Sequence, residues 1–103
     1  MIIYNVTVNI EESVEQEWLN WMKETHIPEV MKTELFESAK MSKVLVEEQM
    51  GGKTYSIQYS CTSHAKLNQY QAIYAKKLQQ EHTEKYQGKF VSFRTLLEVI
   101  SEF

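Results

Sequence analysis

Polar and apolar residues alternate over the first ten positions of the chain. One side of this segment carries Tyr4, Val6, Val8 and Ile10, and the other carries Ile3, Asn5, Thr7 and Asn9. Alternation of this kind, with several β-branched residues, is typical of a strand that buries one face. Met1 to Ile10 is therefore predicted to be the first strand, with the Tyr4 side in the core.

The segment from Glu11 to Thr25 changes to the spacing of a helix. Its large apolar residues recur at intervals of three and four positions and share one helical stripe: Val14, Trp18, Trp21 and Met22. Proline disfavours helical geometry at the residue before it, so we expect a break or kink near Ile27. Pro28 itself suits the first turn of a helix, and a short helix is predicted from Glu29 to Lys32.

Two strands joined by a turn are predicted in the middle of the chain. The first lies between Leu35 and Glu48 and is strongest from Met41 to Val46; the second is Thr54 to Cys61. The stretch Glu48 to Lys53 contains the adjacent glycines Gly51 and Gly52. Glycine enters positive φ at little cost, so a Gly-Gly pair between two strands indicates a hairpin.

A long helix and a last strand complete the pattern. Ser63 is placed to cap the helix, and Gly88 is placed to end it. The apolar stripe of this helix comprises Leu67, Tyr70, Tyr74 and Leu78, with His82 and Tyr86 at its edge. Lys89 to Ile100 is predicted to be the fourth strand.

The order of these elements is βαββαβ, which is the ferredoxin-like arrangement of an α+β protein. Right-handed crossovers place both helices on one face of a four-stranded antiparallel sheet, with the first and third strands at its centre. A chain of 103 residues with this pattern is predicted to be a single domain, residues 1–103.

The sheet face away from the helices is predicted to be mixed in polarity. By alternation it would carry polar residues together with a few apolar ones: Asn5, Thr7, Gln58, Ser60, Arg94, Ile3, Leu45 and Leu96. Two such faces packed across a twofold axis would account for the mixture, with apolar contacts around a partly wet cavity. The sequence thus favours a homodimeric α/β-barrel with room for a small-molecule ligand.

The composition of the chain argues against several classes of function. The 14 acidic and 11 basic residues give a net charge of −3, and no basic cluster stands out, so no nucleic-acid surface is expected. No run of about 18 apolar residues is present, so no membrane span is expected. Cys61 is the only cysteine, which excludes an intrachain disulfide and favours the reducing cytoplasm. The three histidines lack metal-ligand spacing, and no metal site is predicted.

The preferred candidate site combines Asn5, Gln58 and Arg94, which alternation places on the face away from the helices. An arginine in a partly enclosed cavity suits a carboxylate, because its planar fork bonds both oxygens. The alternative is a structural arginine paired with Glu98 or a similar acid across the dimer.

His26 is a second candidate, between the tryptophan stripe and Pro28. A neutral histidine there could act as a general base or orient a ligand. The alternative is that it helps to end the helix by bonding a free carbonyl group or a water molecule.

Five segments together resemble a small, uncharacterised bacterial family catalogued as a domain of unknown function. They are Met1–Val8, Trp18–Val30, Gly51–Tyr59, Gln80–Thr83 and Phe93–Leu97. The resemblance covers nearly the whole chain. It implies a dimeric α/β-barrel of ferredoxin-like subunits, and it implies no particular activity, substrate or catalytic residue.

The wider group with this architecture includes antibiotic-biosynthesis monooxygenases, haem-degrading monooxygenases and muconolactone isomerases. In the haem-degrading members a histidine on the second helix ligates iron, and an asparagine on the first strand bonds the activated oxygen. His82 and Asn5 stand in broadly similar places, although Tyr70 and Tyr74 replace the tryptophan of those enzymes. The alternative for His82 is a half-exposed histidine on an amphipathic helix.

Two hypotheses of function follow. The first is a cytoplasmic homodimer without a cofactor that binds a small molecule or acts as an accessory module. The second is an oxygenase or isomerase of the antibiotic-biosynthesis or haem-degrading type, with haem as the alternative cofactor. Such chemistry needs a base near the substrate, and the sequence shows no committed one, so the first hypothesis is favoured and the question of an enzyme stays open.

Overall fold

The structure is a computed structural model that describes residues 1–46 and 51–103. Its sheet is antiparallel throughout, with the strand order β2-β3-β1-β4. The strands are β1 (Ile2–Ile10), β2 (Ser38–Lys43), β3 (Lys53–Cys61) and β4 (Phe90–Glu98). The predicted ferredoxin-like topology is confirmed, including the central position of the first and third strands.

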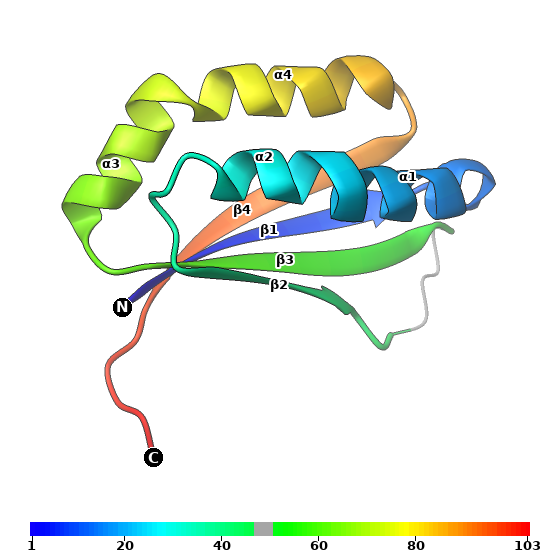
Figure 1. Ribbon diagram of the computed structural model, residues 1–103. Coiled ribbons are helices and arrows are strands. Elements are labelled where there is room, and N and C mark those ends of the chain that lie inside the picture. Colours follow the sequence, from blue (N-terminus) through cyan, green and yellow to red (C-terminus); the bar gives the residue numbers. More distant parts are fainter. Residues whose placement is uncertain (47–50) are drawn as a thin grey trace.

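All helices of the described residues lie on one face of the sheet (Figure 1). The first helical region comprises a 3₁₀ turn (Glu12–Val14), α1 (Glu15–Trp21), a π-helical segment (Met22–His26) and α2 (Ile27–Met31). The second comprises α3 (His64–Ile73) and α4 (Ala75–Lys85). None of these helices is long and apolar enough to cross a membrane.

Of the break or kink predicted near Ile27, the break is wrong, and the departure from regular α-helical geometry is the π-helical segment that ends at His26. Ile27 keeps right-handed helical geometry, with φ −62° and ψ −44°, and its N–H group bonds to the carbonyl of Met22, five residues back. Pro28 does lie in the first turn of α2, as predicted. A proline ring would crowd the carbonyl four residues before it in a regular α-helix. The wider π turn adapts the helix to Pro28 without ending it.

The second helix differs from the prediction in the opposite way, because it is divided. Tyr74 separates α3 from α4 with φ −114° and ψ −33°. A strict four-residue spacing drifts about 40° per step around a helix of 3.6 residues per turn. The bend at Tyr74 rotates α4 relative to α3 and compensates for this drift. Ala75, Leu78, His82 and Tyr86 are therefore buried, while Tyr74 is 36% exposed. The predicted place of His82 and Tyr86 at the stripe's edge is therefore wrong.

The central hairpin is confirmed, but its first strand is shorter than predicted. β2 pairs with β3 and ends at Lys43, and Leu45 is 90% exposed beyond the sheet. The predicted place of Leu45 on the sheet face away from the helices is therefore wrong, because the strand ends before it. Gly51 and Gly52 lead into β3 with φ of +83° and +76°. The predicted strand end and turn residues from Glu47 to Met50 lie outside the described residues.

The caps of the second helical region behave as predicted. The Ser63 hydroxyl accepts a hydrogen bond from the Lys66 N–H group at 3.2 Å, so it is the N-cap of α3. Gly88, at φ +75°, turns the chain from α4 into β4.

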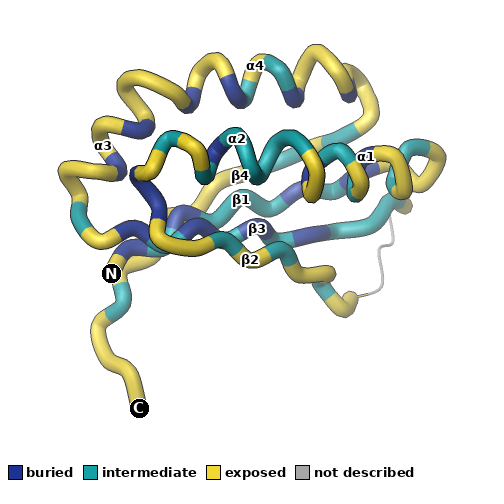
Figure 2. The backbone as a smooth tube through the Cα atoms, viewed as in Figure 1, coloured by how far each residue is buried: buried dark blue, intermediate teal, exposed yellow. Residues whose placement is uncertain are grey.

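The core lies between the sheet and the helices, where the buried positions of both layers face one another (Figure 2). Its most deeply buried side chains are Trp18, Tyr86, Ile10, Ile57, Val30 and Cys61. The alternation read from the sequence of β1 and β3 is thus confirmed, because the Tyr4 side and the Ile57 side are the buried ones.

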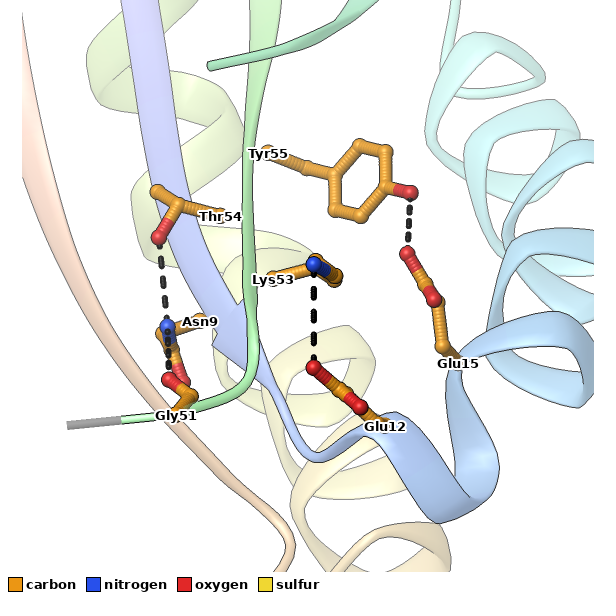
Figure 3. A network of polar contacts seen from close by, with 7 residues as sticks. All are labelled: Asn9, Glu12, Glu15, Gly51, Lys53, Thr54 and Tyr55. Atoms are coloured by element: carbon orange, nitrogen blue, oxygen red, sulfur yellow. Dashed lines mark hydrogen bonds and ion pairs between the residues drawn. The ribbon is translucent and has the colours of Figure 1, made fainter. Parts of the chain in front are cut away.

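Polar contacts fasten the start of α1 to the beginning of β3 (Figure 3). The Tyr55 hydroxyl donates to the Glu15 carboxylate at 2.6 Å, and Lys53 forms an ion pair with Glu12 at 3.6 Å. The Asn9 amide donates to the Gly51 carbonyl at 3.3 Å and thereby holds the end of the hairpin against β1.

The side of β4 that faces the helices was predicted wrongly. Arg94 lies opposite Val6 and Leu96 lies opposite Tyr4 in the β1–β4 register. Because directly opposed residues share a face of the sheet, Arg94 and Leu96 lie on the helix side. The open face of β4 instead carries Val91, Phe93, Thr95 and Leu97.

Candidate functional site

A cavity of about 40 Å³ lies between the sheet and the helices. Its walls include the apolar side chains of Val6, Ile57 and Met22. Its polar lining comes from strands β1, β3 and β4 and from both helical regions. These polar residues are Tyr4, Tyr59, Arg94, Ser92, His26, Tyr70, Gln79 and His82. Two of the three histidines, the arginine and three of the six tyrosines of the sequence therefore meet in this one space.

Tyr4 is the centre of the polar contacts at this cavity. Its hydroxyl oxygen accepts a hydrogen bond from Nε of Arg94 at 3.0 Å and one from Nε2 of Gln79 at 3.4 Å. The three side chains come from β1, β4 and α4, so these hydrogen bonds join the edge strand β4 to the second helical region. The tyrosine ring is buried, while Arg94 is exposed at the edge of the sheet.

His82 is buried and held in one orientation. The indole N–H group of Trp18 donates to Nε2 of His82 at 2.9 Å. Since Nε2 accepts, the hydrogen of the neutral ring is on Nδ1. The pKa of His82 is lowered to about 4, mainly by burial and in smaller part by the nearby His26 and Arg94. His82 is therefore neutral at pH 7.

His26 lies inside the π-helical segment and stacks on Trp21, with ring centroids 5.0 Å apart. Its Nδ1 atom is buried and has no hydrogen-bond partner. Burial lowers the pKa of His26 to about 4, although Glu81 opposes the shift. The alternative that His26 ends the helix is wrong, because the helical backbone continues through it.

Tyr59 and Tyr70 complete the lining on the other side of Tyr4. Their ring centroids lie 6.0 Å and 5.8 Å from that of Tyr4. Burial raises the pKa of both hydroxyls, so each keeps its hydrogen at neutral pH and can donate it.

The structure divides the predicted site residues between two faces. Arg94, His26 and His82 line the cavity, and the two imidazole rings are 5.8 Å apart. Asn5 and Gln58 pair across β1 and β3 on the open face of the sheet. The predicted grouping of Asn5, Gln58 and Arg94 is therefore wrong.

Asn5 already has partners on that open face. Its amide donates to the Thr7 hydroxyl at 3.1 Å, and the Ser56 hydroxyl donates to its carbonyl oxygen. Gln79 also lines the cavity, and the sequence did not single it out because it lies outside the apolar stripe of the helix. The hydroxyl groups of Tyr4 and Tyr59 could have indicated a polar site from the sequence. A strand position that only packs in the core could carry phenylalanine instead of tyrosine.

The residues of the cavity do not fit a haem group. The cavity is far smaller than a porphyrin, Nε2 of His82 accepts the Trp18 hydrogen bond, and Asn5 lies on the opposite face of the sheet. Within residues 1–46 and 51–103, no three histidine, cysteine or acidic side chains are grouped so that they could hold a metal ion.

Solved structures match nearly the whole chain. A dimeric ferredoxin-like protein from an uncultured marine organism aligns with a TM-score of 0.71 at 17% identity, over 100% of this chain and 98% of that chain. An EthD family protein from Bacillus halodurans aligns with a TM-score of 0.70 at 18% identity, over 97% and 100%. A mutant of SnoaB, a cofactor-independent oxygenase from Streptomyces nogalater, aligns with a TM-score of 0.66 at 12% identity, over 98% and 95%.

At identities this low, the structural similarities establish the ferredoxin-like fold and no activity. No curated protein matches the chain. Residues 1–100 match the family described as a domain of unknown function, DUF4286. The five segments of the sequence named above had already indicated a family of this kind, and the chain belongs to the DUF4286 family.

Proposed function

We propose that the protein is a homodimer in which each subunit binds a small molecule in the cavity between its sheet and its helices. The observation that carries this proposal is the Nδ1 atom of His26, which is buried at the cavity without a hydrogen-bond partner. Buried polar atoms nearly always have a partner, so such an atom in a cavity points to a ligand or a bound water. Apolar walls with a few polar groups are the usual lining of a ligand site.

The open face of the sheet supports the homodimer. Val91, Phe93 and Leu97 are 70%, 63% and 44% exposed on β4, and none of the described helices covers this side (Figure 1). A second copy packed face to face would cover this apolar strip. The similarity to proteins described as dimeric and ferredoxin-like agrees with this arrangement. A cytoplasmic location is part of the proposal, since Cys61 is a free, buried thiol.

A second candidate function is a cofactor-independent oxygenase or isomerase. The specific observation in its favour is again His26, a neutral imidazole that could accept a proton inside the cavity. The similarity to SnoaB agrees with it. A pKa of about 4 makes His26 a weak base, however, and an efficient general base has a pKa near the working pH. Binding is therefore the better-supported function.

Native mass spectrometry of freshly purified protein tests the proposal. We expect a dimer mass with a small-molecule adduct of up to one copy per subunit, lost on denaturation. His26→Phe keeps the stack on Trp21 but removes the free nitrogen atom, and we expect this variant to lose at least half of the adduct. His64→Gln, on the exposed first turn of α3, is the matched control and should retain it. A monomer, or a dimer that never carries an adduct, would contradict the proposal.

A further inference from the structure

We propose that the cavity recognises a short-chain carboxylate, with the Arg94 guanidinium and the hydroxyl groups of Tyr4, Tyr59 and Tyr70 as its hydrogen-bond donors. This inference rests on the proposed function, because it names the chemical class of the ligand for the same cavity. The observations that carry it are the charge, the hydrogen-bonding groups and the size of the cavity.

The charge of the cavity is unbalanced. Arg94 is the only arginine of the sequence, and it lines the cavity from β4. The described residues form two ion pairs, Lys53 with Glu12 and Lys89 with Glu11, and neither includes Arg94. Within the described chain Arg94 therefore has no carboxylate partner, and the suggested pairing with Glu98 or a similar acid across the dimer stays a prediction. The guanidinium uses Nε to bond Tyr4 and keeps its four terminal N–H groups for an anion.

The tyrosine hydroxyl groups add hydrogen-bond donors to the lining. Tyr4 accepts from Arg94 and from Gln79, so neither of these hydrogen bonds uses its own hydrogen, which is left to donate. The hydroxyls of Tyr59 and Tyr70 form no hydrogen bond with any residue that the structure describes, and both line the cavity. Three phenol hydrogens and a guanidinium around one space match a ligand that offers two acceptor oxygens and a negative charge.

The size of the cavity limits the ligand. A buried water needs about 10–15 Å³ of such space, so a cavity of about 40 Å³ accepts roughly three water-sized atoms. A carboxylate group has three non-hydrogen atoms. Arg94 is both a lining residue and exposed, so it marks the mouth, where a few further carbon atoms find room. Val6, Ile57 and Met22 form apolar walls that suit a short hydrocarbon chain better than a second charge.

The same features argue against a phosphate as the natural occupant. One cation faces the cavity, because both histidines are neutral at pH 7 and the tyrosines are uncharged. A single guanidinium balances a monoanion, and a phosphate dianion would keep an excess negative charge beside apolar walls. Phosphate is therefore the anion with which the carboxylates are compared.

Isothermal titration calorimetry on the purified full chain tests this inference. The probes are sodium acetate, propionate and butyrate, the corresponding amides, and inorganic phosphate at the same pH 7 and ionic strength. We expect at least one of the three carboxylates to bind, and its amide and phosphate to bind at least tenfold more weakly. Octanoate should bind more weakly than butyrate, because the cavity cannot enclose its chain.

Two variants identify the donors. Arg94→Gln removes the charge, and we expect it to weaken carboxylate binding by a factor of about 10–100, the range of a lost charged hydrogen bond. Tyr59→Phe with Tyr70→Phe keeps the rings and the charge and should weaken binding several-fold. Lys89→Gln, just before β4, removes a positive charge outside the cavity and should leave the affinity unchanged. Thermal unfolding of each variant checks that it is folded.

The outcomes separate this inference from the proposed function. Amides or phosphate that bind as tightly as the carboxylates, or an Arg94→Gln variant with unchanged affinity, would overturn carboxylate recognition. An adduct in native mass spectrometry together with no binding of any carboxylate would overturn it too, while small-molecule binding stood. If no adduct and no binding of any probe were found, both proposals would fall.

Discussion

At the scale of single residues, the cavity brings together two histidines whose surroundings disfavour their charged form. His82 uses Nε2 to accept from the Trp18 indole, and His26 lies flat against Trp21. The rings contact each other edge to face, so protonating either one would place a charge beside the other in a largely apolar space. The pair therefore couples the stability of the fold to pH.

We expect the protein to lose stability as the pH falls from 6.5 towards 4. Each histidine has a pKa of 6.5 in the unfolded chain and about 4 in the folded protein. Between these values the unfolded chain binds more protons, so stability is complete above pH 6.5 and decreases below it. At 1.36 kcal/mol per unit, and allowing for partial screening by solvent, the expected loss is about 2 kcal/mol for each histidine. Urea unfolding at fixed protein concentration from pH 7.5 to 4.5 measures it.

Variants assign this loss to the two rings. His82→Gln still offers an acceptor to Trp18, and His26→Phe still stacks on Trp21, and each should reduce the loss by about 2 kcal/mol. The exposed His64 supplies the control, since His64→Gln should leave the pH dependence as in the wild type. Equal losses in all four proteins would show that other groups govern the acid response.

At the scale of elements, both helical regions depart from regular geometry where they meet the cavity. The π-helical segment Met22–His26 contains His26, and the break at Tyr74 turns α4 so that His82 faces the sheet. Single π turns occur frequently at functional sites. The two irregularities thus place the imidazoles of distant segments side by side, and the regular strands supply the tyrosines and the arginine.

The turn into β3 offers a test at the same scale. Gly52 has φ +76°, and a Cβ atom there would meet the Asn9 side chain and lie 2.9 Å from the Ile10 carbonyl oxygen. Gly51 has a similar φ of +83° with no atom within 4 Å of such a Cβ. We expect Gly51→Ala to cost about 1 kcal/mol, the cost of left-handed geometry, and Gly52→Ala about 3 kcal/mol, because the backbone of β1 must also move. Urea unfolding compares the two, and equal costs would contradict the close contact with β1.

At the scale of the whole molecule, the sheet has one covered face and one open face. The covered face holds the core and the cavity, whereas the open face combines a polar centre with the apolar strip Val91, Phe93 and Leu97 on the edge strand. The C-terminal residues leave the sheet on the side away from the helices (Figure 1), and Ile100 and Phe103 are exposed there. Apolar side chains exposed together in this way favour association.

If two copies pack through this apolar strip, a charge placed on it should separate the dimer into monomers. We expect Phe93→Lys to convert the dimer to a monomer at micromolar concentration, because a buried, unpaired ammonium group is costly. Ile73→Lys is the matched control: Ile73 is 61% exposed, close to the 63% of Phe93, but lies at the end of α3 on the helix side. Sedimentation velocity measures both. A monomeric wild type, or a Phe93→Lys variant that stays dimeric, would contradict packing through the open face.

The sequence by itself determined the order of the elements, the buried sides of β1 and β3, the N-cap at Ser63 and the family. The first three depend on neighbours within one element or one turn, so local periodicity and cap chemistry are sufficient. In β1, for example, one side has Tyr4, Val8 and Ile10 and the other is mostly polar, which leaves a single solution for burial. The family follows from the resemblance of segments spread over nearly the whole chain.

Only the tertiary structure decided the side of β4, the rotation of α4 and the composition of the site. Both sides of β4 carry apolar residues, so alternation grouped Arg94 with Leu96 correctly but could not say which side the helices cover. A bend at Tyr74 rotates α4 and so compensates for the drift of its four-residue apolar spacing. No glycine or proline at this point of the sequence indicates the bend. The cavity joins segments as distant as Tyr4 and Arg94, and such proximity follows from strand register and packing, which no local pattern encodes.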